Sequence, residues 1–183
     1  MKKILSFSGS NSSTSINQMF AHFVADQIQS YEVTKVDLRA FPLPVYSIDI
    51  EKGEGIPENA HKLKALVDEY DAFIISVPEH NSSVPAFFKN TLDWVSRIKM
   101  SFFEEKPILL LSTSPGRGGG RRAIVHAEQI LSNYLKGTVV GKFSLPSFKH
   151  NLAVNGVIAG FEYKELEQEL GELIGKFEEA LAE

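Results

Sequence analysis

The chain has 183 residues, of which 43% are hydrophobic and 23% are charged, and its formal net charge is −4. This composition predicts one globular domain over residues 1–183 and excludes a disordered chain, while the mild negative charge disfavours nucleic acid as a partner. Without cysteine there is no disulfide, thiolate nucleophile or cysteine-ligated metal, and no apolar stretch approaches the ~20 residues of a membrane-spanning helix. We therefore expect a cytoplasmic protein without membrane insertion.

The first half of the chain alternates apolar runs with helical periods. Residues 3–7 predict a buried strand, and the apolar positions between Ile16 and Ile28 predict an amphipathic helix. Residues 32–38 predict a second strand. Residues 41–57 contain three prolines and two glycines, so we expect a long surface loop there. A helix is expected over residues 58–70.

A third strand, residues 72–77, is almost continuously apolar and ends at Pro78. Ser82 or Ser83 is expected to cap the next helix, with Pro85 in its first turn. The remaining expected elements are a strand over 107–112, a helix from Ile124 to Leu135, a strand over 138–145 and a helix from Leu166 to Leu181.

Segment 148–160 is less regular and is expected to be a loop, a short sixth strand or part of an oligomer contact. Strands that alternate with helices predict a parallel sheet with helices on both faces. The fold class is therefore α/β, a three-layer sandwich whose five-stranded sheet has the order 2-1-3-4-5.

Loops after the first, third and fourth strands are expected to meet at the carboxyl edge of this sheet, where open α/β sheets bind ligands. The first loop, GSNSSTSIN over residues 9–17, offers hydroxyls and a helix amino terminus that suit a phosphate. It matches neither GxxxxGK[ST] nor GxGxxG, which disfavours nucleotide hydrolysis and the usual dinucleotide cradle. The structural alternative is an ordinary capped turn.

The other two loops carry different chemistry. Residues 78–81 (PEHN) supply a carboxylate, an imidazole and an amide, and residues 112–122 combine glycines with Arg117, Arg121 and Arg122. Guanidinium groups suit an anionic cofactor. The alternative for each segment is a solvated connection with no ligand.

These three loops together resemble those of the NADPH-dependent FMN reductase family, which has a flavodoxin-like fold. The family's phosphate loop, GSxRxxSxN, matches Gly9, Ser10, Ser15 and Asn17. Its pattern PEYNxSxPxxxKNxxDWxSR matches Pro78, Glu79, Asn81, Ser83, Pro85, Lys89, Asn90, Asp93, Trp94, Ser96 and Arg97. Its third pattern, SxGxxGG followed by arginine, matches Ser114, Gly116, Gly119, Gly120 and Arg122.

By this resemblance, the first loop would hold the FMN phosphate, PEHN would line the isoalloxazine ring, and the third loop would complete the ring and nicotinamide side. The implied FMN-binding residues are Gly9, Ser10, Ser12, Ser15, Ile16, Asn17, Pro78, Glu79, His80, Asn81, Ser114, Gly116, Arg117 and Gly119. Ser12 replaces the family's arginine, which removes a charged bidentate contact. His80 replaces the tyrosine of PEYN.

The function that this resemblance implies is an FMN-dependent oxidoreductase. It would take hydride from NADH or NADPH and pass electrons to a quinone, flavin, azo compound or metal oxyanion. Because the flavin carries the chemistry, no catalytic side chain and no metal are expected. The resemblance also implies a homodimer or homotetramer.

Two other functions remain open from the sequence. The first is a flavodoxin-like FMN electron carrier without its own nicotinamide turnover. The second is a serine hydrolase that uses Ser8 or Ser10 with a histidine, although no GxSxG elbow is present.

Overall fold

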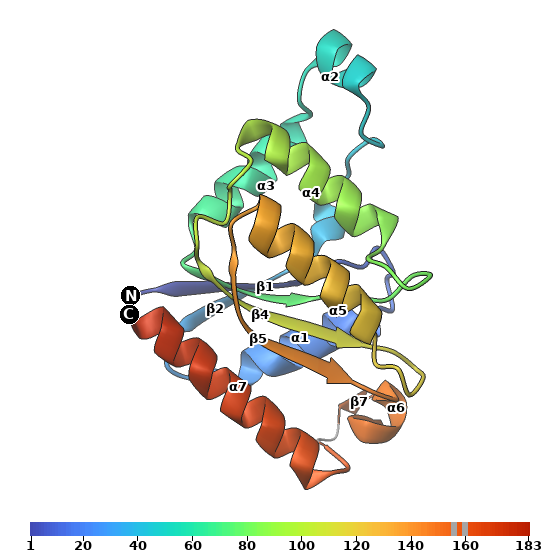
Figure 1. The fold of residues 1–183 in the computed structure, drawn as a ribbon, viewed down its shortest axis with the longest axis vertical. Helices are drawn as coiled ribbons and strands as arrows, with labels where there is room; N and C mark the ends of the chain where they lie inside the picture. Colours follow the sequence, from blue (N-terminus) through green and yellow to red (C-terminus); the bar gives the residue numbers. More distant parts are fainter. Residues whose placement is uncertain (155–156, 159–160) are drawn as a thin grey trace.

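A five-stranded parallel sheet forms the centre of the molecule in the computed structural model, which describes residues 1–154, 157–158 and 161–183 (Figure 1). The strand order is β2-β1-β3-β4-β5, which confirms the predicted flavodoxin-like order. The strands are β1 (Lys3–Ser8), β2 (Glu32–Val36), β3 (Ala72–Ser76), β4 (Pro107–Thr113) and β5 (Thr138–Leu145).

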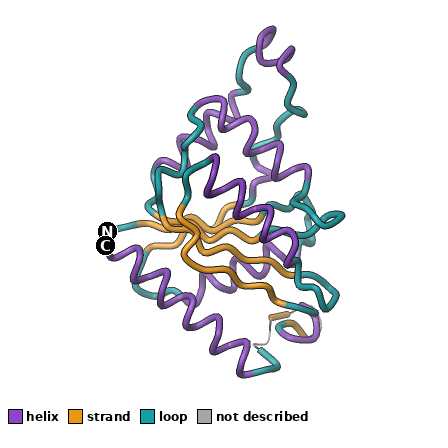
Figure 2. The backbone as a smooth tube through the Cα atoms, viewed as in Figure 1, coloured by secondary structure: helices purple, strands orange, loops and turns teal. Residues whose placement is uncertain are grey.

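Helices cover both faces of the sheet (Figure 2). The helices are α1 (Ile16–Gln27), α2 (Ile48–Glu54), α3 (Glu58–Asp68), α4 (Ala86–Ile98), α5 (Arg121–Glu128), α6 (Phe148–Asn151) and α7 (Lys164–Ala182). Helices α1 and α7 pack on one face, and α3, α4 and α5 pack on the other. The predicted three-layer sandwich is therefore confirmed.

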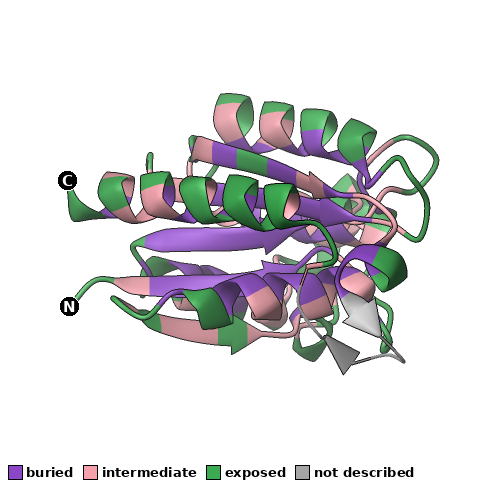
Figure 3. Cartoon of the chain, turned by 90° about the horizontal axis from the view of Figure 1, so that it is seen from below, coloured by how far each residue is buried: buried purple, intermediate pink, exposed green. Residues whose placement is uncertain are grey.

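The apolar character of the central strands follows from this double cover. Every residue of β3 is buried, and so is every residue of β4 after Pro107 (Figure 3). Phe20 and Phe177 fill the core on the α1 and α7 side, while Phe88 and Leu131 fill the core on the other side. Because no residue of β3 faces solvent, its sequence lacks the alternation typical of half-buried strands.

The segment between β2 and α3 corrects two predictions. The second strand ends at Val36 rather than Leu38, because a short 3₁₀ turn begins at Leu38. The predicted loop over residues 41–57 contains helix α2, which Ser47 caps by accepting from the Asp49 amide. This helix buries no residue, so it lacks the apolar period that would have predicted it.

Helix α2 belongs to an arm that projects from the body of the molecule (Figure 1, top). Trp94 of α4 is fully buried, and its indole Nε1 donates to Pro44 O at 2.8 Å. Asn90 Oδ1 accepts from the Tyr46 amide at 2.8 Å, and the Tyr46 ring packs edge-on against Trp94. The base of the arm is thus fixed to α4 by side chains that also carry the family resemblance.

Two helix boundaries also differ from their predictions. Neither Ser82 nor Ser83 caps α4, which follows Pro85 without a side-chain cap. After β4, helix α5 passes into a π-helical turn at Gln129–Tyr134, which shifts the register of the apolar face. Tyr134, the last residue of this turn, is 68% exposed.

The irregular segment 148–160 contains helix α6 and a short antiparallel pair, β6 (Ala153–Val154) with β7 (Val157–Ile158). The prediction of a short extra strand agrees with this pair. Residues 155–156 and 159–160 of this segment lie outside the described residues, and the oligomer contact stays a prediction. Within the described part of the chain, no helix has the length and apolarity needed to cross a membrane.

Candidate functional site

A cavity of about 330 Å³ lies where the loops after β1, β3 and β4 meet. All three predicted loops contribute to its wall, as the parallel sheet requires. Its lining consists of Ser10, Ser12, Thr14, Ser15, Ile16, Asn17, Pro78, Glu79, His80, Thr113, Ser114 and Pro115. The three predicted loops therefore meet at one edge of the sheet, as expected from its parallel strands.

The Asn17 side chain joins two neighbouring strands to helix α1. Its Nδ2 donates to Thr113 O at 3.0 Å, and its Oδ1 accepts from Ser76 Oγ at 2.8 Å and from Thr113 N at 3.0 Å. The residue is 2% exposed. These three bonds hold the first loop against the ends of β3 and β4, so the side chain of Asn17 positions the wall of the cavity.

The first loop presents hydroxyls and amides around the amino terminus of α1. Ser15 Oγ accepts from the Gln18 amide at 3.1 Å, which caps the helix. The amides of Ile16 and Asn17 have no acceptor within the described residues, and the first turn contains no acidic residue. Hydroxyl and amide donors at a helix amino terminus are a donor set that fits a phosphate group.

Gly9 is a glycine for a packing reason. A Cβ at this position would lie 2.7 Å from Cγ of Phe88 on helix α4, and the Gly9 amide donates to Ser76 O at 2.9 Å. The residue is buried and does not line the cavity. The absence of a side chain at Gly9 therefore allows the close approach of α4 to the end of β1.

The PEHN segment ends in a tight turn. His80 and Ser83 exchange two backbone hydrogen bonds of 2.9 and 3.0 Å, and Asn81 and Ser82 both adopt left-handed φ values of 50° and 67°. Pro78, Glu79 and His80 line the cavity, and Asn81 is not among its lining residues. The exposed imidazole of His80 is thus the ring that this segment offers to a ligand.

Glu79 connects the second loop to the third. Its Oε2 accepts from the Arg122 amide in the first turn of α5 at 3.1 Å, where a carboxylate is favoured by the helix dipole. The Arg122 guanidinium also donates to Ser82 Oγ at 3.2 Å. Both loops are consequently fixed relative to each other by contacts around Glu79.

Two glycines of the third loop, Gly119 and Gly120, pack against the ends of β5 and β4. A Cβ on Gly119 would lie 2.6 Å from Ser144 Oγ, and Gly119 and Gly120 have φ values of 59° and 80°. Gly116 and Arg117 are exposed and do not line the cavity. Of this loop, Ser114 alone among the predicted residues reaches the cavity.

Three lining residues were missed by the sequence analysis, namely Thr14, Thr113 and Pro115. Thr14 and Pro115 stand within the predicted loops, so their neighbours were the available signal. Thr113 is the last residue of β4 and is buried, and its Oγ1 donates to Leu145 O at 2.7 Å. Thr113 also lies in the predicted segment 112–122, so its place in the loop after the strand was the available signal.

A second hollow of about 160 Å³ borders the first loop. It shares Ser10, Ser12, Thr14 and Ser15 with the cavity. Its remaining lining is Ser13, Gln18, Met19, His22, Asp37 and Arg39. We call this space the β2-side hollow, because Asp37 and Arg39 follow β2.

His22 in the β2-side hollow predicts a pH dependence of stability. Burial and the charge of Lys35 hold the pKa of His22 below its ordinary value of 6.5, although the carboxylates of Asp26 and Asp37 oppose this shift. The unfolded chain therefore takes up a proton at His22 more readily than the folded chain does. Stability from the neutral imidazole is present above about pH 6.5 and is lost as the pH falls toward the folded-state pKa.

Urea unfolding measured from pH 7.5 to 5 tests this expectation, with pH values chosen to bracket the ordinary histidine range. The His22→Gln variant should lose less unfolding free energy than the wild type as the pH falls. Equal slopes for the two proteins would contradict the assignment to His22.

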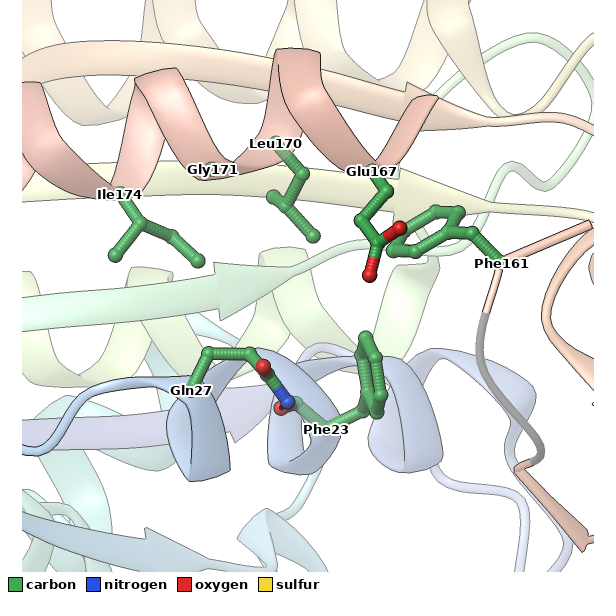
Figure 4. A pocket seen from close by; sticks show the side chains of 7 residues that line it. All are labelled: Phe23, Gln27, Phe161, Glu167, Leu170, Gly171 and Ile174. Atoms are coloured by element: carbon green, nitrogen blue, oxygen red, sulfur yellow. Dashed lines mark hydrogen bonds between the residues drawn. The ribbon is translucent and has the colours of Figure 1, made fainter. Parts of the chain in front are cut away.

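A further hollow of about 310 Å³ lies between α1 and α7, away from the predicted loops (Figure 4). Phe23, Phe161, Leu170 and Ile174 give it an apolar lining, and Gln27 and Glu167 add polar groups. None of its lining residues belongs to the predicted site. None of its lining residues carries a hydroxyl group, in contrast to the cavity at the sheet edge.

The doubly wound sheet and its hydroxyl-lined cavity at the carboxyl edge define a nucleotide-binding type of α/β protein. The chain belongs to the NADPH-dependent FMN reductase family, whose family model matches residues 2–150. It is thus an oxidoreductase of that family.

The names of two similar proteins agree with membership of this family. A quinone reductase of Escherichia coli (strain K12) is 32% identical over 142 residues, covering 75% of this chain and 73% of that protein. The NAD(P)H-dependent FMN reductase PA1204 of Pseudomonas aeruginosa is 31% identical over 130 residues, covering 70% and 69% of the two chains.

Among solved structures, the flavoenzyme NAD(P)H:(acceptor) oxidoreductase FerB of Paracoccus denitrificans superposes with a TM-score of 0.75. The match covers 98% of this chain and 97% of that chain at 22% identity. At this identity, the likeness supports the fold and carries no statement about the site.

Proposed function

We propose that the cavity at the sheet edge binds FMN and that the protein oxidises NADH or NADPH through it. The observation that carries this proposal is the convergence of three loops on one cavity, with a phosphate-type donor set on the first. The family match and the names of the relatives support the same cofactor.

Each loop has a distinct task in this proposal. The phosphate is held by Ser10, Ser12, Thr14 and Ser15 and by the amides of Ile16 and Asn17 at the start of α1. Pro78, Glu79 and His80 border the ring from one side, and Ser114 and Pro115 border it from the other. Bound FMN supplies the redox chemistry by accepting hydride equivalents and passing electrons on.

The chain itself orients FMN, the nicotinamide donor and the electron acceptor, and it needs no acid, base or nucleophile of its own. Asn17 and Glu79 keep the three loops in a fixed relation through the hydrogen bonds described above. The predicted residues Gly9, Asn81, Gly116, Arg117 and Gly119 act in this proposal through the backbone shape of the loops. Donor and acceptor use the same cavity in turn.

The proposed acceptor is a quinone, flavin, azo compound or metal oxyanion. Relatives named quinone reductase, and an NADPH:quinone oxidoreductase of Arabidopsis thaliana that is 30% identical over 132 residues, favour a quinone among these. The alternative is an FMN electron carrier. The mild net charge of −4 favours the enzyme, because a strongly acidic surface is what steers basic protein partners to a carrier.

A visible spectrum tests the proposed function. Purified protein is mixed with FMN, freed of unbound flavin, and then given NADPH without oxygen. We expect flavin bands that are retained and then bleached. Retained bands that NADPH leaves unchanged would support the carrier, and folded protein without retained flavin would contradict the proposal.

We also propose that the protein assembles at least as a homodimer in the cytoplasm. Val45 and Ile48 on the projecting arm are 82% and 46% exposed, and an assembly of two or more subunits is what the family resemblance implies. Analytical ultracentrifugation should give at least twice the mass of one chain. Sedimentation as a monomer at working concentrations would contradict this expectation.

A further inference from the structure

The β2-side hollow adds positive charge to a loop that has none of its own. Residues 9–17 contain no lysine or arginine, and Ser12 stands where the family pattern has arginine. The first loop borders both spaces, because this hollow and the cavity are both lined by Ser10, Ser12, Thr14 and Ser15. A phosphate held by this loop is therefore next to the basic groups of the hollow.

The guanidinium of Arg39 has unused hydrogen-bonding capacity. Its Nε donates to both carboxylate oxygens of Asp37 at 3.0 Å, and its NH2 nitrogen donates to Asp37 Oδ2. Its NH1 nitrogen has no acceptor within the described residues. Arg39 can therefore keep its ion pair with Asp37 and still donate to an anion in the hollow.

His22 is the other basic side chain of the hollow, and it is neutral near pH 7. Its Nε2 lies 2.6 Å from the side-chain nitrogen Nε2 of Gln18, which also donates to Val36 O at 2.9 Å. An imidazole nitrogen accepts from an amide only when it is unprotonated. The same burial and Lys35 charge that lower its pKa oppose protonation. The charge of the hollow consequently comes from Arg39.

We propose that Arg39, which approaches from the end of β2, supplies the positive charge for the FMN phosphate that the first loop of this chain lacks. Arg39 is thus a specificity-determining residue that favours phosphorylated flavin over riboflavin. Asp37 opposes this attraction, because its carboxylate lies against the same guanidinium. This inference rests on the proposed function.

Flavin affinity measured with two ligands tests the proposal. Flavin-free protein is titrated with FMN and with riboflavin, and binding is followed by the change in flavin fluorescence. Arg39→Gln should weaken FMN binding by about five- to tenfold, because a charge-assisted bond at a partly exposed site is lost. Riboflavin binding should change by less than about twofold, since riboflavin has no phosphate for Arg39 to meet.

Two further variants sharpen the result. Asp37→Asn should tighten FMN binding by about twofold or more, because it removes a negative charge beside the phosphate. The side-chain oxygen of the asparagine can still accept from the backbone N–H of Arg39, as Asp37 Oδ1 does. Lys62→Gln removes a charge of the same sign on α3 and should leave both affinities unchanged. The effect of Arg39→Gln should also shrink between 50 and 500 mM salt, as expected of a screened contact.

The two ligands separate the inference from the proposed function. An unchanged ratio of FMN to riboflavin affinity in Arg39→Gln would overturn the inference and leave the flavin site intact. A wild-type protein that binds neither flavin would overturn the proposed function, and the inference with it.

Discussion

Replacing Asn17 with alanine is expected to lower the free energy of unfolding by about 3–5 kcal/mol, because three buried hydrogen bonds are lost and their partners stay desolvated. The stranded groups are Ser76 Oγ and the amide and carbonyl of Thr113. Equilibrium unfolding in urea measures the change. The first loop should also separate from β3 and β4, so flavin affinity should fall together with stability.

Asn11→Ala is the matched control, since Asn11 is an exposed asparagine of the same loop. Its unfolding free energy should stay within about 0.5 kcal/mol of the wild type. A loss below about 1 kcal/mol for Asn17→Ala would show that the three bonds do not hold the loop as described.

Gly9→Ala is expected to destabilise the protein by about 2–3 kcal/mol through overpacking. The new Cβ would lie 2.7 Å from Cγ and 2.9 Å from Cβ of Phe88, a side chain with no exposed surface. Neither α4 nor β1 can move far, because Phe88 packs among buried residues of both the sheet and the neighbouring helices. Urea unfolding again provides the measurement.

A second substitution tests the mechanism of this loss. In a Phe88→Leu background the smaller side chain leaves room for the Cβ, so Gly9→Ala should be less damaging there than in the wild type. Gly53→Ala serves as the control, because no atom lies within 4 Å of a Cβ at Gly53. Strictly additive effects of the substitutions at positions 9 and 88 would contradict the overpacking account.

The fold could be predicted because its decisive signals are local. The continuous apolar run of β3 and the helical spacing of Phe88, Leu92 and Val95 each follow from burial in a parallel sheet with two covered faces. Helix α2 gave no such signal, because it buries none of its residues. The π-helical turn after α5 likewise has no sequence signature in the apolar period.

The site could be predicted to the level of loops and less well to the level of side chains. Ser10, Ser12 and His80 line the cavity because they follow strands that end at one edge. Gly9 and Gly119 carry close packing contacts instead, which depend on residues distant in sequence, Phe88 and Ser144. Arg39 was missed for the same reason, because the end of β2 becomes a neighbour of the first loop only in the folded sheet.

Amide chemical-shift mapping with FMN tests most directly whether the cavity at the sheet edge is the flavin site. Isotope-labelled, flavin-free protein is titrated with FMN, and backbone amide resonances are followed. We predict that the amides of Thr14, Ser15, His80 and Ser114 shift together, while those of Phe23 and Ile174, which line the hollow between α1 and α7, stay in place. Shifts confined to that hollow, or none at all, would contradict the assignment of the flavin site.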